Sequence, residues 1–297
     1  MEIIRTPDDR FSNLPDFDYQ PNYIQIDDTR MHYLDEGQGE VVLCLHGEPS
    51  WSFLYRKFIP ILSSQYRVIA PDLVGFGRSD KYTGVNDYSF AMHFKKLHSF
   101  VDQMGLQEIT LVVQDWGGLL GLSLLGESHE KFSRVVIMNS ALPIGNRPMP
   151  KAFKIWKSFA LNVPGLPIGK IMQMATASKL PKEVIKAYQA PFPSKKYKSG
   201  AKAFPALVPT KPVDPGVPEM KVARDVLAKW DKPALVMFSD KDPIMRGGDR
   251  FFRKLIPGAK EQPEITIENA GHFLQEDKGE EIAGYVKQFM EGSLKVI

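Results

Sequence analysis

Short apolar runs recur along the chain. Segments whose apolar positions recur at helical spacing lie between them. The runs are YIQID, MHYLDE, VVLCLHG, YRVIAPD, ITLVVQD, RVVIMNS, PALVMFSD and PEITIEN. Several are continuous in Val, Ile and Leu, as strands covered on both faces require. Residues 89–104 and 279–290 show apolar positions at helical spacing. The pattern predicts an α/β fold with a mostly parallel central sheet flanked by helices.

The amino-acid composition changes between residues 143 and 212. This interval holds 11 of the 23 prolines of the chain and has no β-branched strand run. We therefore expect an inserted helical segment at residues 143–212, the cap. The core domain is then expected to comprise residues 1–142 and 213–297.

Charge is distributed unevenly, although the net charge of the 297 residues is only +3. The cap carries twelve lysines and Arg147 against Glu183 alone. Two interpretations stay open: a solvated basic face that docks on an acidic body, or a field that draws anions toward the cap. No long basic run is interleaved with aromatic residues, so the sequence predicts a small-molecule substrate rather than nucleic acid.

Targeting signals are not evident. The stretch MEIIRTPDDRFSNLPD has no apolar core of the kind a signal peptide needs, and no apolar run approaches the roughly 20 residues that span a bilayer. The single cysteine, Cys44, lies in an apolar run and is expected to be buried. We expect a cytoplasmic protein without membrane association, with a monomer as the default state.

The stretch ITLVVQDWGG, residues 109–118, predicts a strand that turns sharply into a helix. Such an elbow exposes one side chain at the carboxyl edge of the sheet, and small residues such as Gly117 and Gly118 follow because space is short. Asp115 occupies the place where serine is familiar, and Gln114 precedes it where glycine is common. Taken alone, Asp115 is equally compatible with a helix cap.

Two later strands end in residues that complete a catalytic pattern. Asp240 and Asp242 follow PALVMFS, and His272 follows PEITIEN. The order of nucleophile, acid and histidine is that of triads on this fold. Asp242 is the preferred acid from the spacing in SDKDPI, and Asp240 is expected to cap or to be solvated. The alternative acid position, after RVVIM, holds Asn139, which supplies no carboxylate.

These motifs together resemble the haloalkane dehalogenases of the α/β-hydrolase fold. The resemblance rests on HGEPSW and QDWGG, with PDLVGFGRSD, AYQAPFP and NAGHFLQED in support, and covers nearly the whole chain. QDWGG alone is shared with epoxide hydrolases, whereas its combination with HGEPSW is much more specific. The resemblance implies a subfamily in which a cap tryptophan is the second halide donor.

The chemistry of the residues agrees with that resemblance. A carboxylate is ionised at neutral pH, so Asp115 needs no base to displace a halide from carbon. Water must then hydrolyse the resulting ester, with His272 as the base and Asp242 orienting its ring. The resemblance implies the same roles, and it implies that the backbone N–H groups of Glu48 and Trp116 form the oxyanion hole. It also lets the Glu48 carboxylate help to hold the water, whereas His46 is expected to shape its loop.

The halide and the alkyl chain need their own sites. An indole N–H is a donor without a competing acceptor, which suits a departing halide in a dry pocket. Trp116 is placed for this, and Trp156, the only tryptophan of the cap, resembles the second donor. An apolar substrate pocket is expected from Phe153, Phe159, Phe192 and Pro193, although each is also compatible with the interior of the cap. The mechanism needs no cofactor and no metal, only haloalkane, water and halide.

Three alternatives remain beside this hypothesis. An epoxide hydrolase uses the same three residues and hydrogen-bonds its leaving alkoxide through cap tyrosines, for which Tyr188 and Tyr197 are candidates. A serine esterase is much weaker, because aspartate replaces the hydroxyl nucleophile. A ligand-binding relative without activity commonly loses a triad member, whereas all three are present here.

Overall fold

The computed structural model describes residues 1–294, and its largest feature is a central sheet of eight strands. All eight apolar runs of the sequence form the strands of this sheet, and a separate two-stranded sheet pairs β1 with β6. The strands are β1 (Ile3–Ile4), β2 (Asn22–Ile26), β3 (Thr29–Glu36), β4 (Val41–Leu45), β5 (Arg67–Pro71), β6 (Lys81–Tyr82), β7 (Ile109–Gln114), β8 (Phe132–Met138), β9 (Ala234–Ser239) and β10 (Ile265–Ile267).

The large sheet runs in the order β10-β9-β8-β7-β4-β5-β3-β2. The pairs from β10 to β5 are parallel, and β3 and β2 add two antiparallel strands at one edge. Every residue of β4, β7 and β9 is buried, as expected for strands covered by helices on both faces. The carboxyl ends of the parallel strands therefore meet at one edge, where loops from distant parts of the sequence lie together.

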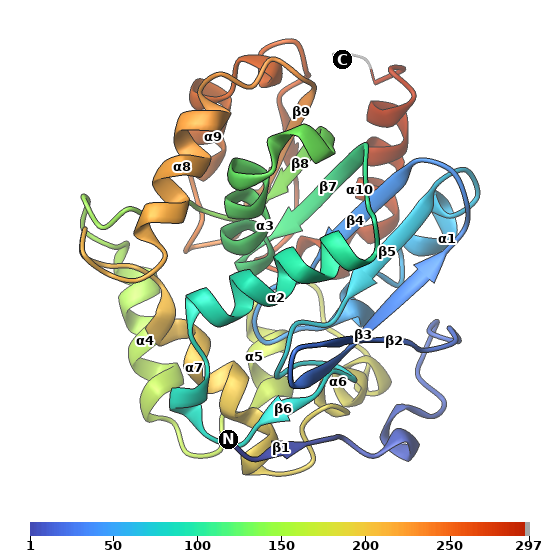
Figure 1. Cartoon of the computed structure of the whole chain (residues 1–297), viewed down its shortest axis with the longest axis vertical. Helices are drawn as coiled ribbons and strands as arrows, with labels where there is room; N and C mark the ends of the chain where they lie inside the picture. The colour runs from blue at the N-terminus through green and yellow to red at the C-terminus, as the bar shows by residue number, and fades with distance from the viewer. Residues whose placement is uncertain (295–297) are drawn as a thin grey trace.

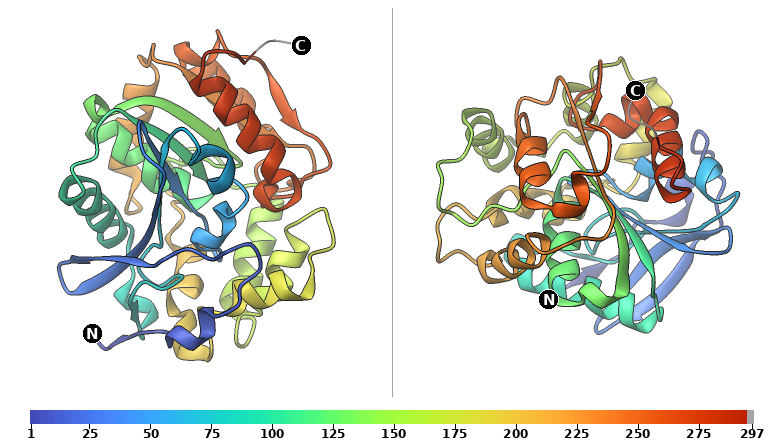
Figure 2. Two further views of the ribbon diagram at one scale, coloured as in Figure 1. Left: turned by 90° about the vertical axis from the view of Figure 1, so that its right-hand side faces the viewer. Right: turned by 90° about the horizontal axis from the view of Figure 1, so that it is seen from above.

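Helices cover both faces of this sheet. Figure 1 shows α2, α3 and α8 in front of it, and the left view of Figure 2 shows the sheet between α2 and α10. The helices are α1 (Ile59–Leu62), α2 (Phe90–Gln103), α3 (Trp116–Glu127), α4 (Lys151–Asn162), α5 (Ile168–Met174), α6 (Lys182–Gln189), α7 (Ser199–Leu207), α8 (Val217–Leu227), α9 (Gly248–Leu255) and α10 (Leu274–Met290).

The two helices expected from the sequence fare differently. Residues 89–104 form α2, with the Ser89 hydroxyl accepting a hydrogen bond from the backbone N–H of Met92 as an N-cap. The expected helix at 279–290 is only the second part of α10, which begins at Leu274. Lys278 has non-helical φ and ψ of −139° and 35°, so the first turn of α10 is offset from the rest. Periodicity could not reveal that turn, because the offset breaks the repeat.

Helices α4 to α7 lie within the interval expected to be the cap, and Figure 1 shows them beside one another below the sheet. Helix α4 packs on α7, and α5 packs on α6. No helix within residues 1–294 is both long and apolar enough to cross a bilayer.

Candidate active site

The turn between β7 and α3 holds Asp115 in an unusual backbone conformation, with φ of 50° and ψ of −123°. Positive φ is rare for residues other than glycine, and it is tolerated where the surrounding structure enforces it. Gly117 and Gly118 leave no space for side chains: a Cβ would collide with the Leu45 carbonyl oxygen at the first and with the Ser140 hydroxyl at the second. The elbow expected from the sequence is thus present.

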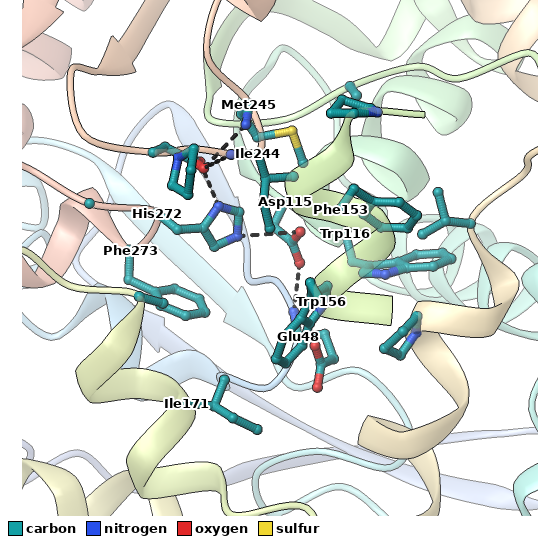
Figure 3. Close-up of a pocket in the computed structure, with 18 of the residues that line it drawn as sticks. Glu48, Asp115, Trp116, Phe153, Trp156, Ile171, Ile244, Met245, His272 and Phe273 are labelled. Carbon is teal, nitrogen blue, oxygen red and sulfur yellow. Dashed lines mark hydrogen bonds and ion pairs between the residues drawn. The ribbon is translucent and has the colours of Figure 1, made fainter. Parts of the chain in front are cut away.

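The Asp115 side chain does not cap α3, although the residue stands at its N-cap position. Its Oδ1 accepts a hydrogen bond of 2.8 Å from the backbone N–H of Glu48, and its Oδ2 lies 3.4 Å from Nε2 of His272. Figure 3 shows Asp115 between these two residues. The capping interpretation of Asp115 is therefore wrong.

His272 joins Asp115 to a second carboxylate. Its Nδ1 lies 2.7 Å from Oδ2 of Asp242, whose Oδ1 accepts hydrogen bonds from the backbone N–H groups of Ile244 and Met245 at 2.8 and 3.2 Å. Asp240 is exposed and accepts a bond from the backbone N–H of Ala270. The structure thus brings Asp115, His272 and Asp242 into one chain of contacts and leaves Asp240 outside it.

Electrostatics tune both partners of this pair. Burial alone would raise the pKa of Asp242, but the ring of His272 and the two backbone N–H groups lower it. Burial of the His272 ring opposes its protonation, yet Asp242 and Asp115 outweigh this effect and raise the pKa of His272 to about 10. The two carboxylates thus favour the protonated form of the ring.

The loop after β4 supplies Glu48, which is 5% exposed and lines the same cavity as Asp115. Burial and the neighbouring Asp115 raise the pKa of the Glu48 carboxyl well above its usual range. His46 accepts a bond of 3.0 Å from the backbone N–H of Leu73 through Nε2, and its Nδ1 lies 3.0 Å from the Gly47 carbonyl oxygen. His46 therefore shapes the loop, as expected.

A cavity of about 360 Å³ opens over Asp115, between the sheet edge and the cap helices. Figure 3 shows Trp116, Phe153 and Trp156 around it, with Ile171 and Phe273 on its other walls. Most lining residues are apolar. Among them are Leu119, Pro143, Met149, Pro150, Met174, Pro205, Val208, Ile244 and Met245.

The expected pocket residues divide into two groups. Trp116, Trp156 and Phe153 line the cavity. Within residues 1–294, the indole N–H of neither Trp116 nor Trp156 has a hydrogen-bond partner. Phe159, Phe192 and Pro193 do not line it. Phe159 is half-buried and packs beside Trp156, whereas Phe192 is buried, packs on Phe76 and belongs to the interior between cap and core.

The tyrosines of the epoxide hydrolase hypothesis lie elsewhere. Tyr188 is fully buried and donates its hydroxyl to the carboxylate of Glu276, which also pairs with Arg56. Neither Tyr188 nor Tyr197 lines the cavity. Within residues 1–294, no tyrosine lines the cavity over Asp115.

Amide and carboxylate side chains anchor the loop that carries His272. The His272 carbonyl oxygen accepts bonds of 3.1 Å from both Gln114 and Asn139, and the carboxylate of Asp277 accepts a bond from the backbone N–H of Gly271. Asp277 also accepts bonds from the N–H groups of Ala177 and Ser178 in the cap. None of these residues was predicted to belong to the site, although Gln114 was conspicuous in the elbow.

Among residues 1–294, no three His, Cys, Asp or Glu side chains are grouped so as to hold a metal ion.

Comparisons with known proteins place the chain in a family. A family described as the alpha/beta hydrolase fold matches residues 40–279. The chain is 49% identical to a haloalkane dehalogenase of Psychrobacter cryohalolentis over 98% of both chains, and 46% identical to one of Mycobacterium marinum over 95% of this chain and 98% of that relative. A solved haloalkane dehalogenase, DpaA of Paraglaciecola agarilytica, superposes with a TM-score of 0.90 at 38% identity over 96% and 97% of the two chains, and is described as tetrameric.

Proposed function

The chain belongs to the haloalkane dehalogenases of the α/β-hydrolase fold, hydrolases that act on carbon–halide bonds, and from this premise we propose how its own residues perform the reaction. The proposal is a covalent ester on Asp115 that water hydrolyses to a primary alcohol, halide and a proton. The observation that carries it is the contact of Asp115 with both the Glu48 N–H and His272 inside an apolar cavity.

The first step assigns different roles to the two oxygens of Asp115. Oδ1 is held by the Glu48 N–H, and Oδ2, which lies 3.4 Å from Nε2 of His272, is the nucleophile. Its electron pair forms the bond to the substrate carbon, and the carbon–halogen bond breaks with its pair on the halide. The indole N–H groups of Trp116 and Trp156, both at the cavity wall, stabilise the developing halide charge.

The second step cleaves the ester. Water loses a proton to Nε2 of His272 and attacks the carboxyl carbon of Asp115, while Asp242 orients the ring and stabilises the imidazolium. The negative charge develops on Oδ1, to which the backbone N–H of Glu48 already donates. The backbone N–H of Trp116 is the proposed second donor to this oxygen. Collapse breaks the bond between the carboxyl carbon and Oδ2, and the alcohol leaves with the proton of the added hydroxyl. The Asp115 carboxylate is thereby restored, and His272 returns its own proton to solvent. No cofactor enters either step.

The cap, taken as residues 143–212, serves in this proposal as the cover that excludes water during the first step. It supplies Trp156 and Phe153 to the cavity together with further wall residues such as Ile171, Met174 and Val208, and the core supplies the rest of the wall. Alkyl chains rather than polar substrates suit such a wall.

The decisive experiment measures halide release from 1-bromobutane and 1,2-dibromoethane, beside diol formation from styrene oxide, without added cofactor. We expect halide release with turnover from the wild-type chain. The His272→Ala variant should release one equivalent of halide per protein and then stop, because the ester forms but water is not activated. Diol without halide would transfer the assignment to an epoxide hydrolase.

A further inference from the structure

Gln114, the residue before the nucleophile, makes contacts that the two proposed steps do not use. It ends β7, is completely buried, and its Nε2 donates a hydrogen bond of 3.1 Å to the His272 carbonyl oxygen. The same Nε2 lies 3.1 Å from Nε2 of the His272 ring. One amide group thus touches both the backbone and the reactive nitrogen of the base.

The hydrogen-bond roles at this contact are fixed by the partners. A side-chain amide nitrogen only donates, and the orientation of the Gln114 amide is set by its bond to the carbonyl oxygen of His272. Nδ1 of His272 faces the Asp242 carboxylate at 2.7 Å and therefore carries a proton. The amide then stabilises the ring only while Nε2 has a free electron pair, since an N–H at Nε2 would oppose it.

The other half of the amide supports a specific role. Within residues 1–294, Oε1 of Gln114 is buried and has no hydrogen-bond partner. A buried carbonyl without a partner costs free energy, so an apolar side chain here would be cheaper if packing were the only requirement. The amide nitrogen, with its two contacts to His272, is the part of the side chain that offsets this cost.

We propose, on the basis of the ester mechanism above, that Gln114 is a positioning residue that holds His272 in the form with an unprotonated Nε2 once Asp115 is esterified. Three carboxyl groups face the same ring: Asp242 and Asp115 favour the imidazolium, and Glu48 lines the cavity beside them. Lys241, also at the cavity, directs its amine to Asn269. Esterification removes the charge of Asp115. The Gln114 amide then opposes the remaining carboxylate, Asp242, which favours protonation of the His272 ring.

The test compares Gln114→Met, which removes the donor, with Gln114→Glu, which places a carboxylate beside the ring. Single-turnover experiments with 1-bromobutane separate ester formation from ester hydrolysis at each pH. We expect both variants to release one equivalent of halide. Ester hydrolysis should be about tenfold slower at pH 7, because the acidic limb of its pH–rate profile moves to higher pH. A shift of about one pH unit in the limb corresponds to that tenfold loss. The shift should be larger in Gln114→Glu.

Asn139→Ala is the matched control. Asn139 donates to the same carbonyl oxygen of His272 at 3.1 Å but has no contact with the ring nitrogen. This variant is expected to slow hydrolysis without moving the limb. An unmoved limb in both Gln114 variants, or an equal movement in Asn139→Ala, overturns the proposal. Failure of the wild-type chain to release halide would instead overturn the proposed function, so the two failures are distinguishable.

Discussion

At the scale of single residues, the site depends on side chains that perform two tasks with different atoms. Asp115 directs one oxygen to the Glu48 N–H and the other toward His272. His272 in turn contacts Asp242 through Nδ1 and Asp115 through Nε2. Because each contact is made by a separate atom, substitution at one position changes the charge felt at the next without removing the whole chain of contacts.

The first prediction concerns that charge. The Asp115→Asn variant carries a neutral group where the ester would stand, so the pKa of His272 should fall below its value of about 10 in the wild-type chain. Titration of the histidine resonances by NMR measures this. Glu48→Gln is the control and should move the pKa less, because the pKa of the Glu48 carboxyl is raised well above its usual range. An unchanged pKa in Asp115→Asn would show that the carboxylate does not control the base.

The second prediction concerns the halide donors. Trp156→Phe keeps an aromatic ring at the cavity wall and removes its N–H, and a hydrogen bond to a charged group contributes about 1.5 kcal/mol, or roughly tenfold in affinity. We expect bromide to inhibit this variant about tenfold more weakly than it inhibits the wild-type chain.

Trp230→Phe is the matched control, because Trp230 is buried and does not line the cavity. Equal bromide inhibition constants for Trp156→Phe and the wild-type chain would remove Trp156 from the halide site.

At the scale of elements, the start of α10 connects the cap with the core. Glu276 pairs with Arg56 and accepts the hydroxyl of Tyr188 from α6, while Asp277 binds the cap at Ala177 and Ser178. Arg56 and Glu276 are 2% and 1% exposed, so neither charge is hydrated. The same short segment follows His272 directly, which places the base and the cap on a common support.

The third prediction tests this buried pair. Glu276→Gln leaves the Arg56 charge buried without a partner, which should lower the free energy of unfolding by about 3 kcal/mol. Urea denaturation measures the loss. The double variant Arg56→Met with Glu276→Leu should recover most of it, because no charge is then left unpaired.

Glu280→Gln serves as the control for that series. Glu280 is 67% exposed and lies 3.8 Å from Lys57, a surface pair expected to contribute less than about 1 kcal/mol. If Glu276→Gln were no more damaging than Glu280→Gln, the buried pair would not be what joins α10 to the core.

Elements with a strong local signal were predictable, and contacts that depend on the tertiary fold were not. The continuous apolar run of β7 and the glycines after Asp115 identify the elbow, because both follow from local sterics. Trp156 was expected at the cavity because it is the only tryptophan of the cap, and it lies in the cavity wall, while its halide role stays a prediction. Phe192 was left open between the pocket and the interior of the cap, since its partner Phe76 lies far away in sequence and no periodicity reveals it. The contacts of Gln114 were missed for the same reason.

At the scale of the whole molecule, the basic charge of the cap is not neutralised by contact. Within the described part of the chain, none of the twelve cap lysines forms an ion pair with a carboxylate. Four of them, Lys195, Lys196, Lys198 and Lys202, line a second hollow of about 270 Å³. Uncompensated charge of one sign attracts anions over distances comparable with the screening length.

The fourth prediction follows from this field. Bromide inhibition should weaken as ionic strength rises from 10 to 300 mM, because the screening length falls from about 30 Å to less than about 10 Å over that range. The measurement is the bromide inhibition constant at fixed pH in a salt whose anion is too large for the cavity. A constant that does not depend on ionic strength would favour the solvated basic face.

The association state belongs to the same scale. We keep the expectation of a monomer as a prediction, to be measured by sedimentation equilibrium, although the structural relative DpaA is described as tetrameric. A mass four times that of the 33.5 kDa chain would overturn it.

The order of the strands also has a consequence for synthesis. After β7, the chain adds β8, β9 and β10 outward on one side of the sheet, and the cap is made between β8 and β9. Asp115 therefore leaves the ribosome well before Asp242 and His272, which follow β9 and β10. Until then the Asp115 carboxylate lacks its contact with His272, and the cap helices emerge with their apolar faces uncovered before the edge strands are in place. A nascent chain stalled between β8 and β9 should thus expose this surface to chaperones, whereas one stalled after α10 should not.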